Sequence, residues 1–181
     1  MEKIRCGWCE KDDLYRKYHD EEWGRPVYDD ETIFEFLILE SFQAGLSWYT
    51  ILSKREAFDE FDYKKIADYS DEKVEELMQN PGIVRNRLKV LATITNAQKF
   101  QEIQEEFGSF SKYIWGFVGG RPIKNNPKTL KDVPATTEIS DILSKDLKKR
   151  GFKFMGSTVV YTHMQATGMV NDHLKSCFIK R

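Results

Sequence analysis

Cysteine is scarce in this sequence, and long apolar segments are absent. The 181 residues include only three cysteines, an odd number that argues against a disulfide framework and for a metal site or free thiols. No run of about 20 apolar residues occurs, so we expect no membrane span. No apolar signal region follows the first residues, and we therefore expect a cytoplasmic protein.

A large net charge of either sign is also lacking. The formal net charge is -1, which excludes a protein that coats nucleic acid through bulk positive charge. Basic residues nevertheless cluster twice, once at Arg85, Arg87 and Lys89 and once within 145–153. The simplest interpretation of such clusters is a solvated helix face.

Strand-like alternation is nearly absent, and we find no internal repeat, low-complexity tract or linker. Hydrophobic residues make up 40% of the chain and aromatic residues 13%, which is enough for a substantial core. Apolar residues recur mostly at helical spacing. We therefore predict an all-α fold in a single unit, 1–181, built as one lobe or as two closely packed helical lobes.

Capping residues and helix breakers predict where the helices begin and end. Asp29 or Asp30 can cap a buried helix, Ser70 can cap another, and Gly151 and Gly168 are typical of positions just after a helix. A loop rich in glycine and proline is expected at 119–127. The expected helices cover 33–41, 47–58, 71–78, 84–107, from Thr136 or Thr137 to 150, and 157–167.

Cysteine and histidine form one pattern across the two ends of the chain. Cys6 and His19 lie near the start, and His173 and Cys177 lie near the finish. Two thiolates and two imidazoles match the preference of tetrahedral zinc. His173 and Cys177 are four residues apart, so a helix would place both on one face. A site with four protein ligands has no open position, so we predict one structural zinc ion that joins the two ends.

Cys9 leaves alternatives open. It forms a CxxC motif with Cys6, which could bind metal or perform redox chemistry, and Cys9 could replace Cys6 as a ligand. The motif does not follow a strand or open a βαβ unit, which weakens a thiol–disulfide function. His163 lies outside the pattern, in an apolar segment, and we expect it to be a packed core histidine.

Flat side chains are frequent in the first quarter of the sequence. Aromatic walls suit a flat ligand and favour a cationic one through cation–π attraction. The alternative is that these residues are ordinary core aromatics. The candidates are Trp8, Tyr15, Tyr18, Trp23 and Trp48.

Glu40 is the acid that stands out. It shares a helix face with the apolar residues Phe36 and Leu37, and a buried carboxylate is costly unless it finds a partner. Glu40 therefore pairs with an arginine, emerges into water at the helix end, or serves a site whose ligand brings the hydrogen-bond donor.

The segment NPGIVR at 80–85 joins two predicted helices by a very short turn. Free backbone N–H groups at the start of the second helix can receive a phosphate, and nearby basic residues add charge. This pattern fits a helix-hairpin-helix that grips the DNA backbone without reading sequence, although many such turns bind nothing. The expected DNA contacts are Gly82, Ile83, Arg85 and Arg87.

Short motifs lie across almost the whole chain: CGW at 6–8, LY at 14–15, YHD at 18–20, EWG at 22–24, LE at 39–40, QAGLSW at 43–48, LKKRGFKF at 147–154 and NDH at 171–173. Together these motifs resemble those of the DNA-3-methyladenine glycosylase I family. The resemblance implies a helix-hairpin-helix DNA glycosylase fold with a structural zinc, and an enzyme that removes 3-methyladenine from alkylated double-stranded DNA.

The resemblance also assigns roles. It places the four cysteine and histidine candidates on the zinc ligands, Glu40 on the acid that hydrogen-bonds the excised base, and the five aromatic residues around that base. The pocket contains no lysine nucleophile, which suggests a monofunctional glycosylase without strand nicking. Three positions depart from the family pattern: Phe42 replaces a residue that is often polar, Cys9 is not part of the pattern, and Val84 stands where helix-hairpin-helix relatives commonly carry a second glycine.

The expected chemistry needs little acid catalysis. Methylation at N3 makes the base cationic and a good leaving group, and a damaged nucleotide is cheaper to flip out. Glu40 can accept from the exocyclic amine, but no general base for the attacking water is identifiable. We expect no nucleotide cofactor and a monomer. Two alternatives remain, a non-catalytic lesion-binding module on the same fold and a CxxC thiol–disulfide protein.

Overall fold

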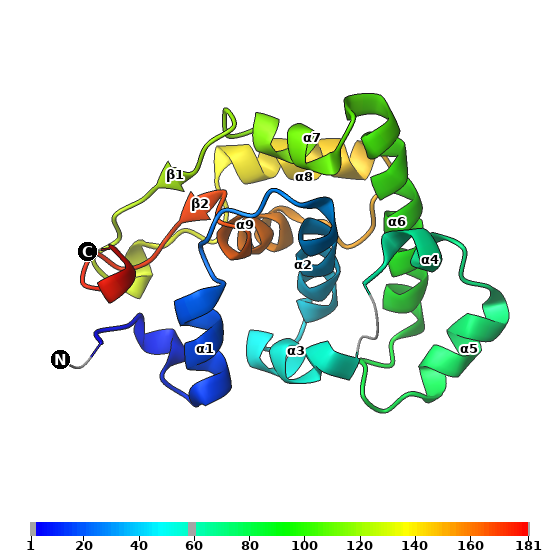
Figure 1. Ribbon diagram of the computed structural model, residues 1–181, viewed down its shortest axis with the longest axis horizontal. Helices are drawn as coiled ribbons and strands as arrows, with labels where there is room; N and C mark the ends of the chain where they lie inside the picture. The colour runs from blue at the N-terminus through cyan, green and yellow to red at the C-terminus, as the bar shows by residue number, and fades with distance from the viewer. Residues whose placement is uncertain (1–2, 58–60, 181) are drawn as a thin grey trace.

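The computed structural model describes residues 3–57 and 61–180, and its fold is mostly helical (Figure 1). This confirms the helical class expected from the sequence. The α-helices are α1 Asp13–Glu21, α2 Asp30–Gln43, α3 Trp48–Lys54, α4 Tyr63–Ala67, α5 Asp71–Gln79, α6 Arg87–Phe107, α7 Phe110–Gly116, α8 Glu138–Lys149 and α9 Ser157–Ala166. Short 3-10 helices lie at Gly7–Cys9, Arg55–Ala57, Leu130–Asp132 and Phe178–Lys180.

The predicted caps begin their helices. The side chain of Asp29 accepts from the backbone N–H of Thr32 at 2.8 Å at the start of α2. Ser70 and Thr137 cap α5 and α8 in the same way. Asp30, the other candidate for α2, instead accepts from the first N–H groups of α7, so one acid joins two helices.

Helix α2 forms the centre of the molecule. Figure 1 shows it enclosed by α3, α6 and α9, with α7 and α8 above. Residues all round α2 are buried, as its nearly continuous apolar sequence predicts. Phe34 packs against Phe100 of α6 with ring centroids 5.1 Å apart, and Phe100 stacks on Phe110 of α7. The core therefore fixes the far end of α2, where Glu40 lies.

Several predicted boundaries were wrong. Helix α6 begins at Arg87 rather than 84, because Asn86 is its cap and accepts from the N–H of Lys89 at 3.2 Å. Helix α3 ends at Lys54 and continues as a 3-10 turn, and the predicted end at Phe58 lies outside the described residues. The expected loop at 119–127 contains strand β1, Ile123–Lys124, which pairs in parallel with β2, Val170–Asn171.

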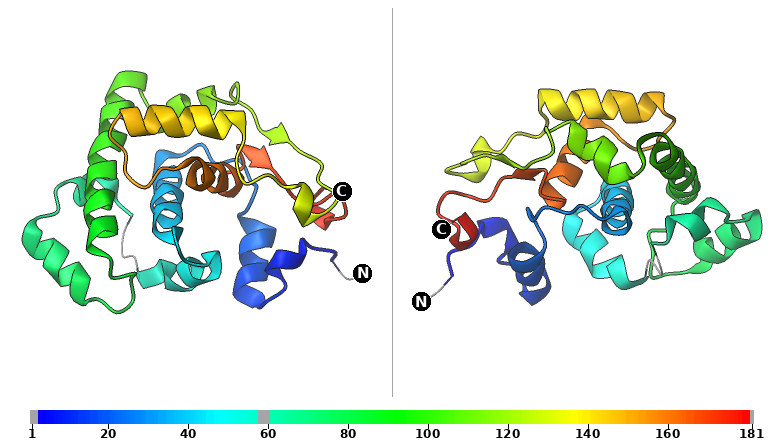
Figure 2. Two further views of the ribbon diagram at one scale, coloured as in Figure 1. Left: turned by 180° about the vertical axis from the view of Figure 1, so that it is seen from behind. Right: turned by 45° about the horizontal axis from the view of Figure 1, so that its top comes forward.

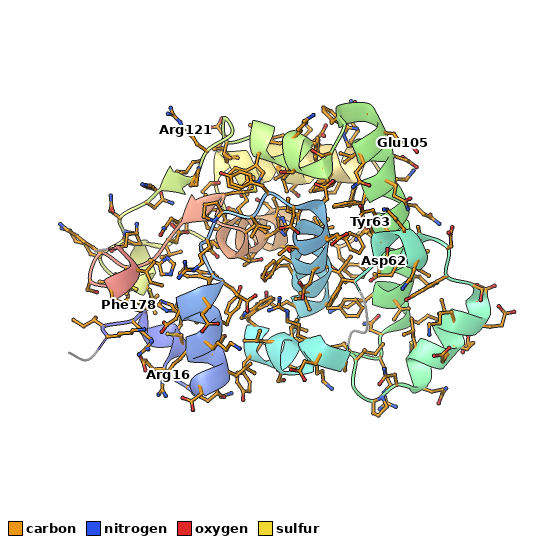
Figure 3. The ribbon with its side chains drawn as sticks, in the orientation of Figure 1. Arg16, Asp62, Tyr63, Glu105, Arg121 and Phe178 are labelled. Carbon is orange, nitrogen blue, oxygen red and sulfur yellow. The ribbon has the colours of Figure 1, made fainter. Side chains whose placement is uncertain are left out.

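The first and last described segments lie together (Figures 1 and 2). The N–H of Phe178 donates to the carbonyl of Ile4 at 2.8 Å, and Figure 3 shows Phe178 beside the start of the chain. Lys3 and Arg5 both lie over the Phe178 ring. Among the described helices, none combines the length and apolar character needed to cross a membrane.

Candidate functional site

A cavity of about 310 Å³ gathers all six predicted pocket residues. The 3-10 helix Gly7–Cys9 and α1 supply one wall, the ends of α2 and α3 a second, and α9 a third. The cavity is therefore assembled from segments that are far apart in the sequence. Its lining consists of Trp8, Tyr15, Tyr18, Trp23, Glu40, Gln43, Trp48, Leu130, Val133, Thr162, Gln165 and Asp172.

The aromatic residues support one another mainly through edge contacts. Trp8 meets Tyr15 at 5.1 Å and Trp23 at 5.0 Å between ring centroids, both in T-shaped pairs. Tyr18 is buried and lies 5.4 Å from the Trp48 ring. Tyr18 belongs to the core as well as to the cavity, whereas the other four are only partly buried and line the open space.

Glu40 is a buried acid without a charged partner among the described residues. Only 3% of it is exposed, and its Oε2 atom has no hydrogen-bond partner. Burial raises the pKa of Glu40 to about 8, against a smaller lowering by a hydrogen bond with Thr162. The structure thus contradicts two interpretations, an arginine pair and a helix end that emerges into water. The third interpretation remains, in which Glu40 serves a site whose ligand brings the hydrogen-bond donor.

Trp48 provides a complementary unpaired group. Its indole Nε1 is buried and has no hydrogen-bond partner among the residues that the structure describes, so a donor and an acceptor line the same cavity unsatisfied. A buried polar group without a partner typically costs about 1–3 kcal/mol. A flat ligand with both an acceptor and a donor on its edge would satisfy both groups.

Four polar residues of the cavity were missed by sequence reasoning, and one of them is Gln43, the last residue of α2. Thr162 and Gln165 lie on α9, and Asp172 follows β2. Asp172 accepts hydrogen bonds from Tyr161 at 2.6 Å, Gln165 at 2.9 Å and Asn125 at 2.7 Å. The NDH motif was a signal for Asp172, whereas Thr162 and Gln165 carry no pattern that separates them from other polar helix residues.

The cysteine and histidine candidates lie together where the two ends meet. The ligand atoms of Cys6, His19 and Cys177 lie within 4.8 Å of one another, and all three side chains are buried. His19 places Nδ1 2.9 Å from Asp20 and Nε2 3.6 Å from the Cys177 sulfur. A carboxylate behind a histidine is a common way to orient that ring toward a metal. These three residues could hold a metal ion.

His173 lies beside this group but not on a helix. No helix places His173 and Cys177 on one face, because residues 172–177 follow β2 as irregular and turn backbone. The His173 ring lies 5.0 Å from the His19 ring, and its buried Nε2 has no hydrogen-bond partner within 3–57 and 61–180. Gly24, at φ +74°, leaves room for this ring, since a Cβ there would come within 2.7 Å of it.

The other cysteine and histidine have different surroundings. The Cys9 thiol donates to the Cys6 carbonyl at 3.0 Å and is not in the group of three, which favours Cys6 as the ligand. Burial raises the pKa of Cys9 to about 11, so the thiol is a poor nucleophile. His163 is a buried core residue, as expected, and burial lowers its pKa to about 3.

The α5–α6 hairpin is less open than expected. The N–H of Gly82 donates to the Asn80 side chain at 2.8 Å, and Ile83 is buried. Arg87 pairs with Glu75 at 2.5 Å, whereas Arg85 is exposed and has no ion pair within the described residues. Of the four residues expected to contact DNA, Arg85 is therefore the one whose charge is directly available.

A second tight hairpin joins α8 to α9. Gly151 and Phe154 adopt positive φ angles of +99° and +55°, and Gly156 caps α9 without any side-chain hydrogen bond. The buried Asn96 of α6 holds the backbone N–H and C=O of the exposed Lys153 at 2.8 and 3.1 Å. The sequence indicated only the helix end at Gly151, not this fixed turn.

The helical fold thus encloses a cavity with aromatic walls and one buried carboxyl group. A model of the methyladenine glycosylase family matches residues 8–180, and the chain belongs to that family. DNA-3-methyladenine glycosylase 1 of Escherichia coli (strain K12) is 47% identical over 177 residues, covering 96% of this chain and 95% of the relative.

Solved structures agree with this assignment. A crystal structure of 3-methyladenine DNA glycosylase I matches with a TM-score of 0.95 at 46% identity, covering 98% of this chain and 100% of that chain. A structure that describes 3-methyladenine recognition by the Staphylococcus aureus glycosylase I matches with a TM-score of 0.94 at 39% identity, covering 98% and 96% of the two chains.

Proposed function

We propose that this protein is a base-excision repair enzyme that hydrolyses the N-glycosidic bond of 3-methyladenine in alkylated double-stranded DNA. The observation that carries the proposal is the buried carboxyl group of Glu40 inside an aromatic cavity, with an Oε2 atom that has no hydrogen-bond partner among the described residues. The family membership and the activity named for the Escherichia coli relative support the same reaction.

The pocket residues act by recognising a cation. The flipped base carries positive charge, which the aromatic faces attract. Glu40 accepts from its exocyclic amine, and a nearby cation favours the ionised carboxylate, so binding releases a proton from an acid whose pKa is about 8 in the free protein. When the glycosidic bond breaks, its electron pair stays with the base and neutralises it. Water adds to the sugar carbon and loses its proton to solvent.

We propose a monofunctional enzyme. Strand nicking by a glycosylase requires an amine that attacks the sugar, and none of the described residues that line the cavity is a lysine. Lys89, a buried lysine on α6, has its ammonium group held by two backbone carbonyls and is not part of the lining. The cationic leaving group removes the need for covalent catalysis.

We propose that Cys6, His19, His173 and Cys177 hold one structural zinc ion. Three of them are already grouped, and the unpaired Nε2 of the fourth lies in the same buried region. Four protein ligands would close the coordination sphere, so the ion would supply stability and no step of the reaction. The four side chains would fasten the first described turn to the last.

Contact with the DNA backbone is proposed for the α5–α6 hairpin, through Gly82, Ile83, Arg85 and Arg87, as a helix-hairpin-helix. The exposed Arg85 supports this placement. The α8–α9 hairpin is a second candidate, because the first N–H groups of α9 have no side-chain cap and Lys153 is exposed. Charge-reversal substitutions at each hairpin would show which of the two contacts the DNA backbone.

The domain organisation proposed is a single unit, 1–181, with the base cavity between packed helices. The cavity takes residues from near both ends, which supports one unit. A monomer that needs no nucleotide cofactor remains a prediction.

The test is release of bases from DNA treated with a methylating agent, with freed bases identified by mass and strand breaks measured on the same sample. We expect free 3-methyladenine and intact phosphodiester bonds. Binding of the methylated DNA without base release would replace the enzyme with a lesion-binding module.

A further inference from the structure

Lys89 is buried without a carboxylate partner among the described residues. Only 6% of it is exposed, and its Nζ donates to the carbonyls of Phe42 at 2.7 Å and Ala44 at 2.6 Å. A buried charge is costly unless it is compensated. Here two backbone carbonyls provide the compensation, so the interaction ties α6 to one specific point of the backbone.

That point is the C-terminal end of α2. Helix α2 ends at Gln43 with Ala44 as its cap, and the last carbonyls of a helix have no partner within it. A cation at this end is favoured by the helix dipole. The last turn carries Glu40 and Gln43, which both line the cavity. Lys89 therefore holds the turn from which the acid projects.

The backbone continues from this turn into α3, which belongs to the same wall of the cavity. The N–H of Leu46 donates to the Gln43 carbonyl at 2.6 Å, and Ser47 caps α3, whose first residue is Trp48. The two unpaired groups of the cavity, on Glu40 and Trp48, thus stand on either side of the backbone that Lys89 holds. A shift of Ala44 would move both of them.

Helix α6 touches the site only indirectly. It runs beside α2 in both Figure 1 and Figure 2, and it contributes no residue to the cavity lining. Lys89 is in its first turn, immediately after the α5–α6 hairpin, and its N–H is held by Asn86. One side chain therefore connects the hairpin to the pocket.

We propose that Lys89 is a positioning residue for the base pocket, holding the end of α2 so that Glu40 and Trp48 meet one ligand. This inference rests on the proposed function. Lys89 does not touch the base, and it acts through the backbone of Phe42 and Ala44. Its loss should therefore change the geometry of the bound base more than the binding of undamaged DNA.

The experiment compares wild type with Lys89→Met, which keeps the length of the side chain and removes the ammonium group. Free 3-methyladenine affinity is measured by calorimetry, and kcat and KM are measured on methylated DNA. We expect Lys89→Met to weaken base affinity and to lower kcat about 10- to 100-fold, with KM and undamaged-DNA affinity nearly unchanged.

Two controls separate positioning from stability. Ile103→Ala removes a buried side chain from the same helix and should lower the melting temperature while leaving base affinity intact. Lys112→Met removes an exposed lysine of α7 and should change neither. If Lys89→Met does not fold, Lys89→Gln, which keeps a donor on a shorter and uncharged side chain, is measured in the same way and should show a smaller loss of the same kind.

Measurements on the wild-type protein in the same assays test the proposed function itself. A wild-type protein that neither binds nor releases 3-methyladenine contradicts the function itself. Wild-type activity together with unchanged base affinity and kcat in Lys89→Met, or in Lys89→Gln if that variant replaces it, contradicts the positioning role. A loss that Ile103→Ala shows to the same extent also contradicts it.

Discussion

At the scale of single residues, the buried carboxyl group of Glu40 is the central feature of the cavity. Burial disfavours its charged form in the free protein, and a cationic base would restore that form. The free protein therefore bears a cost at Glu40 that its ligand removes. A substitution that removes the Glu40 carboxyl group should therefore lower the affinity for the base and raise the stability of the free protein.

Glu40→Gln should weaken free 3-methyladenine binding by about 1.5–3 kcal/mol, because a neutral amide oxygen replaces a charged acceptor. Calorimetric titration measures this loss directly. Glu31→Gln, an exposed substitution at the other end of α2, is the matched control and should bind like wild type. Equal affinity in Glu40→Gln and wild type would remove Glu40 from base recognition.

The stability of the free protein should depend on pH through Glu40. Its pKa is raised from 4.5 to about 8, so the folded state holds a proton that the unfolded state loses. The contribution of Glu40 to stability is complete below about pH 4.5 and declines as pH rises to about 8, by up to ~1.4 kcal/mol per pH unit. Urea unfolding at several pH values should show this slope in wild type and a smaller one in Glu40→Gln.

At the scale of elements, sequence reasoning succeeded where a single residue decides. Asp29, Ser70 and Thr137 cap their helices because a side-chain oxygen beside free N–H groups is a local interaction. The sequence did not predict three short helices, α1, α4 and α7, which have nine, five and seven residues. Short helices depend on tertiary packing, which the local sequence does not reveal. The two-residue strands exist only because distant segments meet.

The sequence likewise predicted some residues of the candidate site and not others. Glu40 and the aromatic residues were predictable, because an acid on an apolar face and a run of flat side chains are unusual. Thr162 and Gln165 were not, since their role depends on where α9 packs. His173 lies in the cysteine and histidine region, as the sequence pattern predicts, but on turn backbone, because four-residue spacing alone cannot distinguish a helix from a turn.

The two hairpins can be separated by charge reversal. Arg85→Glu should weaken binding of undamaged duplex DNA and lower the magnitude of the salt slope by about 1, if the α5–α6 hairpin contacts phosphate. Lys153→Glu tests the α8–α9 hairpin in the same titration. Arg121→Glu, in an exposed loop away from both hairpins (Figure 3), is the control. A normal salt slope in Arg85→Glu with a reduced one in Lys153→Glu would move the DNA contact to α8–α9.

At the scale of the whole molecule, the two ends of the chain are joined beside the base cavity. Trp8 and Trp23 line the cavity, and Trp8 lies 5.4 Å from the His19 ring while Trp23 lies 4.6 Å from the His173 ring. An ion bound by the histidines would therefore hold the aromatic wall as well as the ends. Metal binding would then couple the stability of the protein to base binding through this region.

Cys177→Ala should lower the melting temperature by about 10 °C or more. Loss of a structural metal belongs to the changes that exceed about 4 kcal/mol, and each kcal/mol corresponds to ~2–4 °C in a chain of this size. Calorimetry and metal analysis by mass spectrometry provide the measurement. Cys9→Ala should keep one zinc per chain, since Cys9 is outside the group. Full zinc content in Cys177→Ala would exclude Cys177 as a ligand.

The most direct test of the central claim is single-turnover excision of 3-methyladenine from methylated duplex DNA by wild type and Glu40→Gln, with metal content matched. We expect rapid release by wild type, release slowed by about tenfold or more in Glu40→Gln, and unbroken strands in both. Equal rates in the two proteins would show that the buried acid does not recognise the departing base.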